Sequence, residues 1–172
     1  MTESYLRLVQ DIFNGKARYV KCETIPALRG LYWAEGVESG DAHANWSDFE
    51  SVFHELQNIK GQFYIVGDYT IFYGIVGRPS LGSLLWFHKG LTYPSKYDAT
   101  QDQKLARSVD RPEVTQIVVE QKMFMGTRQL VDFPMLQRVI SDHYHPTKQF
   151  GLFKIYRRNE SDMNILKDND GV

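Results

Sequence analysis

The sequence predicts an α/β fold of the α+β kind, in which helices cover both faces of a single mixed, mostly antiparallel sheet. The first observation behind this prediction is that helical hydrophobic spacing alternates along the chain with short runs rich in β-branched and aromatic residues. The second is composition, because 42% hydrophobic and 24% charged residues are ordinary for a globular protein with a sizeable core. A length of 172 residues suits one domain, 1–172.

The first third of the chain predicts a helix, a strand and a second helix. Residues 1–15 carry an apolar stripe and end at a glycine, which favours an N-terminal helix (Tyr5, Leu8, Val9, Ile12, Phe13). Residues 16–23 alternate as a strand does. Thr24 can then cap a short helix, because Pro26 is tolerated in a first turn.

Residues 47–60 form the clearest element. Apolar residues recur at helical spacing, and Ser47 with Glu50 has the pattern of a capping box (the stripe is Phe49, Val52, Phe53, Leu56, Ile59). The next segment, QFYIVGDYTIFYGIVG at 62–77, contains two β-branched and aromatic runs separated by Gly67-Asp68. This pattern predicts a β-hairpin.

Residues 78–112 are expected to form an insertion between core strands, with a short strand at 84–88 and a brief helix at 100–107. A β-branched strand at 114–120 follows. Asp132 can cap a helix that stops before Pro146, and 151–157 reads as the last strand. The chain is expected to end with a further helix at 159–167 and a polar tail, 168–172.

Charge and cysteine content narrow the classes of function. Twenty basic and 21 acidic residues give a net charge of −1, which provides no electrostatic footprint for nucleic acid or a membrane surface. The lone Cys22 excludes a disulfide framework within the chain, and no apolar run reaches the length of a membrane span. We therefore expect a cytoplasmic protein that does not bind membranes, with nucleic acid an unlikely partner.

Five segments in order resemble the GNAT superfamily of acyl-CoA-dependent N-acyltransferases. They are ETIPALRGLYWAEG (23–36), SDFESVFHEL (47–56), GQFYIVGDYTIFYGIVG (61–77), VTQIVVEQKMFMG (114–126) and YRRNESDMNILKDNDG (156–171). No one segment is specific, so the evidence for the resemblance is their shared order. In this family, the fourth segment corresponds to a central strand that leads to the pyrophosphate loop.

The resemblance implies transfer of an acyl group from acetyl-CoA or another acyl-CoA to the amine of a small molecule or a protein. The implied cofactor contacts are backbone groups of Ile117, Val118 and Val119 for the pantetheine arm and Asn159 near the thioester. The implied pyrophosphate loop comprises Gln121, Gly126, Thr127 and Arg128. Backbone N–H groups and a basic side chain suit such an anion.

The same resemblance implies a general base for the amine and an acid for the leaving thiolate. A carboxylate on the central strand serves as base in the family, which indicates Glu120 or Glu113. The family's acid is a tyrosine in the last helix, where this chain has Leu166, and Tyr156 is the nearest substitute. This chemistry requires no metal.

A Mg²⁺-dependent nuclease of the PD-(D/E)XK type is the first alternative. Glu120 and Lys122 alternate onto one face of a strand, and Asp68 at the end of an earlier run could complete a two-carboxylate site. Gln137 lies on the next helix. Asp102 and Lys104 have the same spacing, without a strand around them.

The second alternative is a non-catalytic scaffold with a GNAT-like fold. Arg128 occupies the place where the family's loop has a glycine or alanine, and the catalytic tyrosine is absent. In that case the aromatic and lysine-rich segment 78–112 would bind a protein partner.

Overall fold

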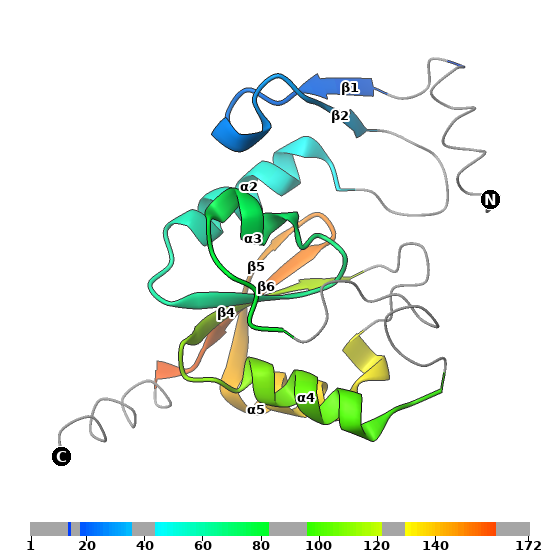
Figure 1. The fold of residues 1–172 in the computed structure, drawn as a ribbon, viewed down its shortest axis with the longest axis vertical. Coiled ribbons are helices and arrows are strands. Elements are labelled where there is room, and N and C mark those ends of the chain that lie inside the picture. The colour runs from blue at the N-terminus through cyan, green and yellow to red at the C-terminus, as the bar shows by residue number, and fades with distance from the viewer. Residues whose placement is uncertain (1–13, 15–17, 36–43, 83–95, 122–129, 161–172) are drawn as a thin grey trace.

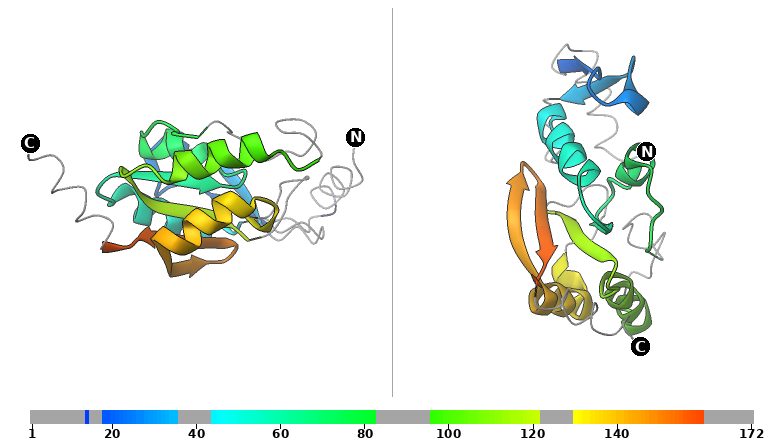
Figure 2. Two further views of the ribbon diagram at one scale, coloured as in Figure 1. Left: turned by 90° about the horizontal axis from the view of Figure 1, so that it is seen from below. Right: turned by 90° about the vertical axis from the view of Figure 1, so that its left-hand side faces the viewer.

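The computed structural model describes residue 14 and residues 18–35, 44–82, 96–121 and 130–160. It has three layers, seen in Figure 1 with the four-stranded sheet in the middle. Helices α2 (Trp46–Gln57) and α3 (Ile71–Val76) lie on one face, and α4 (Ala99–Val109) and α5 (Pro134–His143) lie on the other. Figure 2 shows the same layers from two further directions. The predicted mixed α/β class is confirmed.

The sheet has the strand order β3-β4-β6-β5. Strand β3 (Gln62–Val66) runs parallel to β4 (Val114–Glu120), whereas β6 (Phe153–Arg158) is antiparallel both to β4 and to β5 (Tyr144–Phe150). Strand β4 is therefore interior, with a partner on each side. Its near-continuous apolar sequence, VTQIVVE, fits a strand that is covered on both faces.

Each face of the sheet has its own hydrophobic core because side chains alternate along a strand. The core under α2 and α3 contains Val118 of β4 and is rich in aromatic residues (others include Phe49, Phe53, Phe63, Phe72 and Phe153). The core under α4 and α5 contains Ile117 and Val119 (with Leu105, Val109, Leu136, Ile140 and Tyr144).

A small N-terminal unit packs on the outer side of α2, away from the sheet. Strand β1 (Arg18–Lys21) pairs antiparallel with β2 (Tyr32–Glu35) through the 3₁₀ turn η1 (Pro26–Leu28). Two hydrogen bonds fasten it to the start of α2, from Trp33 Nε1 to the Ala44 carbonyl at 2.7 Å and from the Trp46 N–H to Glu35 Oε1 at 2.6 Å.

The hairpin predicted over 62–77 is wrong in its second half, because β3 is followed by the helix α3. The segment Ile71–Val76 places Phe72 and Tyr73 in the core, and Gly77 ends the helix with φ of 74°. Its β-branched and aromatic residues favour a strand locally, but packing against α2 and β3 decides the outcome. The Tyr73 hydroxyl accepts the Ile65 N–H at 2.9 Å, at the outer edge of β3.

Two further strands were absent from the sequence prediction. Strand β2 occupies the place where the Thr24 helix was expected to continue, and only η1 of that helix forms. Strand β5, YHPTKQF, is mostly exposed and contains Pro146. It lies at the sheet edge, where proline and exposed polar residues are tolerated and oppose edge-to-edge pairing.

The caps predicted for α2 and α5 do not form, and longer-range contacts replace them. Helix α2 begins at Trp46 without a side-chain cap, so Ser47 and Glu50 form no capping box. Helix α5 begins after Phe133, and Asp102 of α4 accepts its first N–H groups from Met135 and Leu136 at 2.9 and 3.0 Å. The predicted cap, Asp132, lies instead in the 3₁₀ turn η2 (Leu130–Asp132).

The helix expected at 100–107 is confirmed as α4, which lies within the range predicted as an insertion, 78–112. Its residues Leu105 and Val109 are fully buried in the core under the sheet. The N-terminal helix expected over 1–15 and the strand at 84–88 lie outside the described residues, as does the polar tail 168–172.

Candidate functional site

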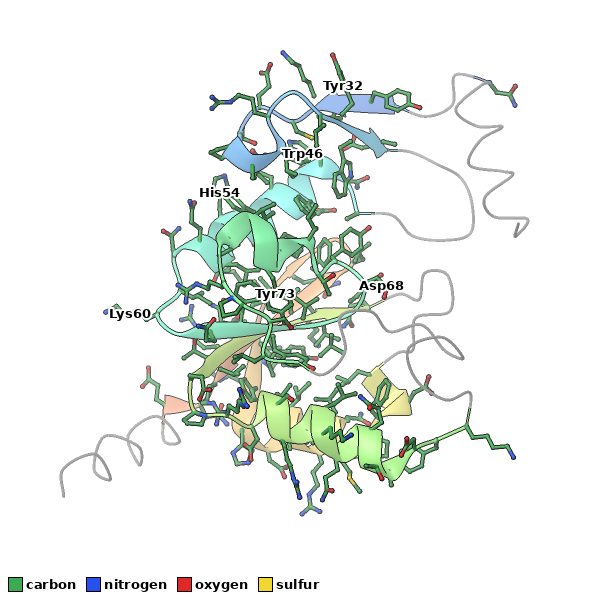
Figure 3. All side chains as sticks on the ribbon, viewed as in Figure 1. Tyr32, Trp46, His54, Lys60, Asp68 and Tyr73 are labelled. Carbon is green, nitrogen blue, oxygen red and sulfur yellow. The ribbon has the colours of Figure 1, made fainter. Side chains whose placement is uncertain are left out.

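Two carboxylic acids, Asp68 and Glu120, meet where the parallel strands β3 and β4 end. The last backbone pair between these strands joins Val66 with Val119. Beyond it, the Asp68 N–H donates to the Glu120 carboxylate, Oε2, at 2.9 Å. The carboxyl ends of adjacent parallel strands are the usual place for a binding crevice in open α/β sheets. Figure 3 shows Asp68 at this end of β3, with Lys60 at the opposite end.

Gly67 permits this close approach. Its φ is 155°, and a Cβ atom there would lie 2.5 Å from Glu120 Oε2 and 2.7 Å from Glu120 Cβ. Any other residue would push the carboxyl away from the end of β3. The glycine thus leaves room for the Glu120 carboxyl beside the end of β3, a role that sequence reasoning missed, although a glycine directly before an aspartate at a strand end was its visible signal.

Glu120 is 6% exposed, and its Oε1 atom has no hydrogen-bond partner among the described residues. Burial raises its pKa to about 7; the Asp68 N–H opposes this shift, and the negative charge of Asp68 adds to it. A buried, unsatisfied carboxyl oxygen is costly, which makes it a strong candidate for contact with a ligand.

Aromatic side chains form the apolar floor of the site. Tyr69 follows Asp68 directly, and its ring packs edge-to-face on Phe153 with centroids 4.9 Å apart. Phe153 is paired in register with Glu120. The Tyr69 hydroxyl accepts the Ala44 N–H at 3.0 Å, which anchors the ring, and burial raises the pKa of Tyr69 to about 12. The rings of Tyr69 and Phe153 keep water away from the inner side of the Glu120 carboxyl.

Two carboxylates at this site would suit a cation that prefers oxygen ligands, such as Mg²⁺. No three His, Cys, Asp or Glu side chains within the described ranges are grouped so as to hold a metal. Asp68 and Glu120 would therefore supply two carboxylates, and water and substrate would supply the rest. Mg²⁺ is typically bound in this way, by one or two carboxylates together with substrate phosphates, whereas structural zinc requires four protein ligands.

The other two predicted catalytic residues lie away from Glu120. Glu113 precedes the opposite end of β4, where it is exposed and pairs loosely with Arg111 at 3.8 Å. Tyr156 packs against the core on the other face of the sheet. Neither can share a reaction centre with Glu120.

The structure describes five of the residues predicted to bind coenzyme A, namely Ile117, Val118, Val119, Gln121 and Asn159. Ile117, Val118 and Val119 are paired with β3 on one side and β6 on the other, which leaves no free backbone edge for a pantetheine arm. The Gln121 N–H donates to the Leu152 carbonyl at 2.8 Å. The remaining loop residues, Gly126, Thr127 and Arg128, lie outside the described residues, as does Lys122.

Asn159 is also remote from the site. It follows the end of β6 whose residue Arg157 pairs with Gln116, whereas Glu120 pairs with Phe153 at the other end. Six residues of strand separate Asn159 from Phe153, or roughly 20 Å. Its side chain contacts His145 Nδ1 at 2.8 Å and the Asp142 carbonyl at 3.3 Å. Asn159 and Gln121 thus lie toward opposite ends of the sheet.

Comparisons with known proteins assign no family to the chain. No family model and no curated protein matches the chain. One solved structure is similar, the C-terminal globular domain of the oligosaccharyltransferase AfAglB-S2 from Archaeoglobus fulgidus. It is 14% identical, with a TM-score of 0.36, over 69% of this chain and 100% of that one. A similarity this low supports no conclusion about the function of this chain. Among the described helices, none has the length and apolarity to cross a membrane.

Proposed function

We propose that the protein is a Mg²⁺-dependent hydrolase that cleaves phosphodiester bonds of nucleic acid, despite a net charge of −1 that by itself disfavours this substrate. The observation that carries this proposal is the contact between the Asp68 N–H and the Glu120 carboxylate at the ends of β3 and β4, with Glu120 Oε1 buried and without a partner among the described residues. A nuclease of the PD-(D/E)XK type needs such a pair of carboxylates. The paired strands and Gly67 supply a rigid base for it.

Asp68 and Glu120 would hold the cation, and when bound it supplies Lewis-acid stabilisation of the phosphoryl charge and a more acidic water. Glu120 is held in place by the Asp68 N–H and by the apolar surface of Tyr69 and Phe153. That surface excludes water from the buried side of the carboxyl. A low local dielectric strengthens every charge interaction made there.

The proposal is tested by incubating the protein with single- and double-stranded DNA and RNA in Mg²⁺ or in EDTA. We expect cleavage by the wild type in Mg²⁺ only, and a loss of at least about a hundredfold in Glu120→Gln and Asp68→Asn. Glu113→Gln is the matched control, because it changes an exposed glutamate at the other end of the same strand. Cleavage that survives in Glu120→Gln, or no cleavage of any of the four substrates, would reject the proposal.

Gly67→Ala gives an independent check of the geometry. The added Cβ would displace Glu120, so cleavage should fall as it does in Glu120→Gln. Gly74→Ala in α3 is its control, because nothing lies within 4 Å of a Cβ at that position.

A second candidate is N-acyl transfer to an amine, which the pKa of Glu120 favours. A carboxyl with a pKa of about 7 is suited to remove a proton from an attacking amine near neutral pH. The described residues provide no site for coenzyme A, so this candidate rests on Glu120 alone. Calorimetric titration with acetyl-CoA distinguishes the two, since the hydrolase should show no binding of acetyl-CoA at millimolar concentration.

A further inference from the structure

A pocket of about 840 Å³ lies at the other end of the sheet from Glu120. It opens between the C-terminal part of α2, the turn that leads into β3, and strands β4 to β6. Its members on β4 are Thr115 and Gln116, and Gln116 lies four residues before Glu120, roughly 13 Å away along the strand. Figure 3 shows Lys60 at this end and Asp68 at the other. The pocket is thus separate from the carboxylate site, and the inference from it does not depend on the proposed function.

Basic side chains dominate the pocket. Lys60, Lys148 and Arg157 are exposed there, and Glu55 sits among them with its carboxylate 2.6 Å from Lys148 Nζ and 3.7 Å from an Arg157 Nη atom. With the exposed Glu160, which also lines the pocket, two carboxylates face these three cations. The excess positive charge favours an anionic ligand.

A buried amide side chain, that of Gln116, lines the same pocket. Gln116 is 2% exposed; its Nε2 donates to Glu55 Oε1 at 3.3 Å, and its Oε1 has no hydrogen-bond partner among the described residues. A buried carbonyl oxygen without a partner is costly unless a donor reaches it. The ligand should therefore carry a hydroxyl or N–H group as well as its negative charge.

The remaining lining residues indicate which class of ligand the pocket suits. Among the described residues that line the pocket, Ile59 is the apolar one and none is Phe, Tyr or Trp, so these residues offer no ring on which a nucleobase could stack. Its volume falls within the usual range for a small-molecule site. A polyhydroxy molecule with one anionic group satisfies the cations, the Glu55 carboxylate and the Gln116 carbonyl together.

We propose that this pocket binds a sugar phosphate. The phosphate faces Lys60, Lys148 and Arg157, and hydroxyl groups of the sugar donate to Gln116 Oε1 and Glu55. Arg158, although part of the wall, does not contact the phosphate. Its guanidinium is directed to the carbonyls of Val109, Arg111 and Val114.

Isothermal titration calorimetry on the full chain tests this proposal with glucose 6-phosphate, ribose 5-phosphate and glycerol 3-phosphate. Glucose and inorganic phosphate serve as partial ligands. At least one of the three phosphorylated compounds should bind at least about tenfold more tightly than either partial ligand. No binding of any of the three at about 10 mM would overturn the proposal. It would also be overturned if inorganic phosphate bound as tightly as they do, which would leave a simple anion site.

Charge-removing variants locate the bound phosphate. Lys60→Gln and Arg157→Gln should each weaken binding about tenfold, because each removes a charged contact from an exposed side chain that the fold does not need. Lys154→Gln is the matched control. It removes the same charge from the same strand as Arg157, but its side chain extends over the Tyr156 ring on the opposite face. Equal affinities for Arg157→Gln and Lys154→Gln would place the ligand elsewhere.

Discussion

Glu120 links stability to pH at the scale of a single residue. Its folded pKa is raised from 4.5 to about 7, so the unfolded chain gives up this proton at a lower pH than the folded one. The stabilising contribution is therefore complete below about pH 4.5 and is lost as the pH rises through about 7. At about 1.4 kcal/mol per pH unit, the loss is about 3 kcal/mol.

Urea unfolding of the wild type and of Glu120→Gln in EDTA, from pH 4.5 to 8, checks this expectation. The wild type should lose about 3 kcal/mol relative to the variant over that range, because the amide cannot ionise. The difference between the two proteins is the quantity of interest, since other groups titrate equally in both. Parallel pH profiles would show that Glu120 is not buried as described.

Some residues of the candidate site could be predicted from the sequence. Glu120 and Asp68 could be named because each ends an apolar run, and strand ends bring side chains together. Glu113 and Asn159 were placed with Glu120 through the resemblance alone, and strand register puts them at the other end of the sheet. The Gln116 carbonyl, which has no partner among the described residues, could not be anticipated, because the contacts of this side chain involve Glu55 of another element.

At the scale of elements, Asp102 joins helices α4 and α5. It is fully buried, and besides the Met135 and Leu136 N–H groups it accepts the Tyr97 hydroxyl at 3.0 Å. A carboxylate at a helix N-terminus also interacts favourably with the positive end of the helix dipole. In the sequence, Asp102 and Lys104 have the same spacing as Glu120 and Lys122 of the predicted metal site. The structure gives Asp102 a structural role instead.

Asp102→Ala should lower the free energy of unfolding by about 3 kcal/mol, because two helix N–H groups and a tyrosine hydroxyl lose a charged acceptor. Asp98→Ala, which removes the local cap of α4 at an exposed site, should cost about 1 kcal/mol. Chemical denaturation of both variants measures the difference. Similar losses would mean that Asp102 contributes no more than an ordinary cap.

Elements with a strong local pattern were predictable, and those determined by distant contacts were not. Helices α2 and α4 follow from helical spacing and strand β4 from its β-branched run. Helix α3 reads as a strand by propensity and becomes helical through its packing. Strand β5 is polar and contains a proline, so only its pairing with β6 identifies it.

At the scale of the whole molecule, the sheet keeps two polar regions apart at its opposite ends. Glu120 and Asp68 lie where β3 and β4 end, and the pocket around Gln116 lies near where β4 begins. The aromatic core between them contains Val118, so the two regions lie on one face of β4 and are separated by core residues. The three-layer class was predictable from the alternation of patterns, whereas this separation required the register of the strands.

Direct titration with Mn²⁺, followed by its electron paramagnetic resonance signal, tests the central claim that Asp68 and Glu120 hold a divalent cation. We expect one bound ion per chain that Mg²⁺ displaces, and a loss of affinity of at least about tenfold in Glu120→Gln and Asp68→Asn but not in Glu113→Gln. Unchanged affinity in Glu120→Gln, or no bound Mn²⁺ in the wild type, would contradict the account.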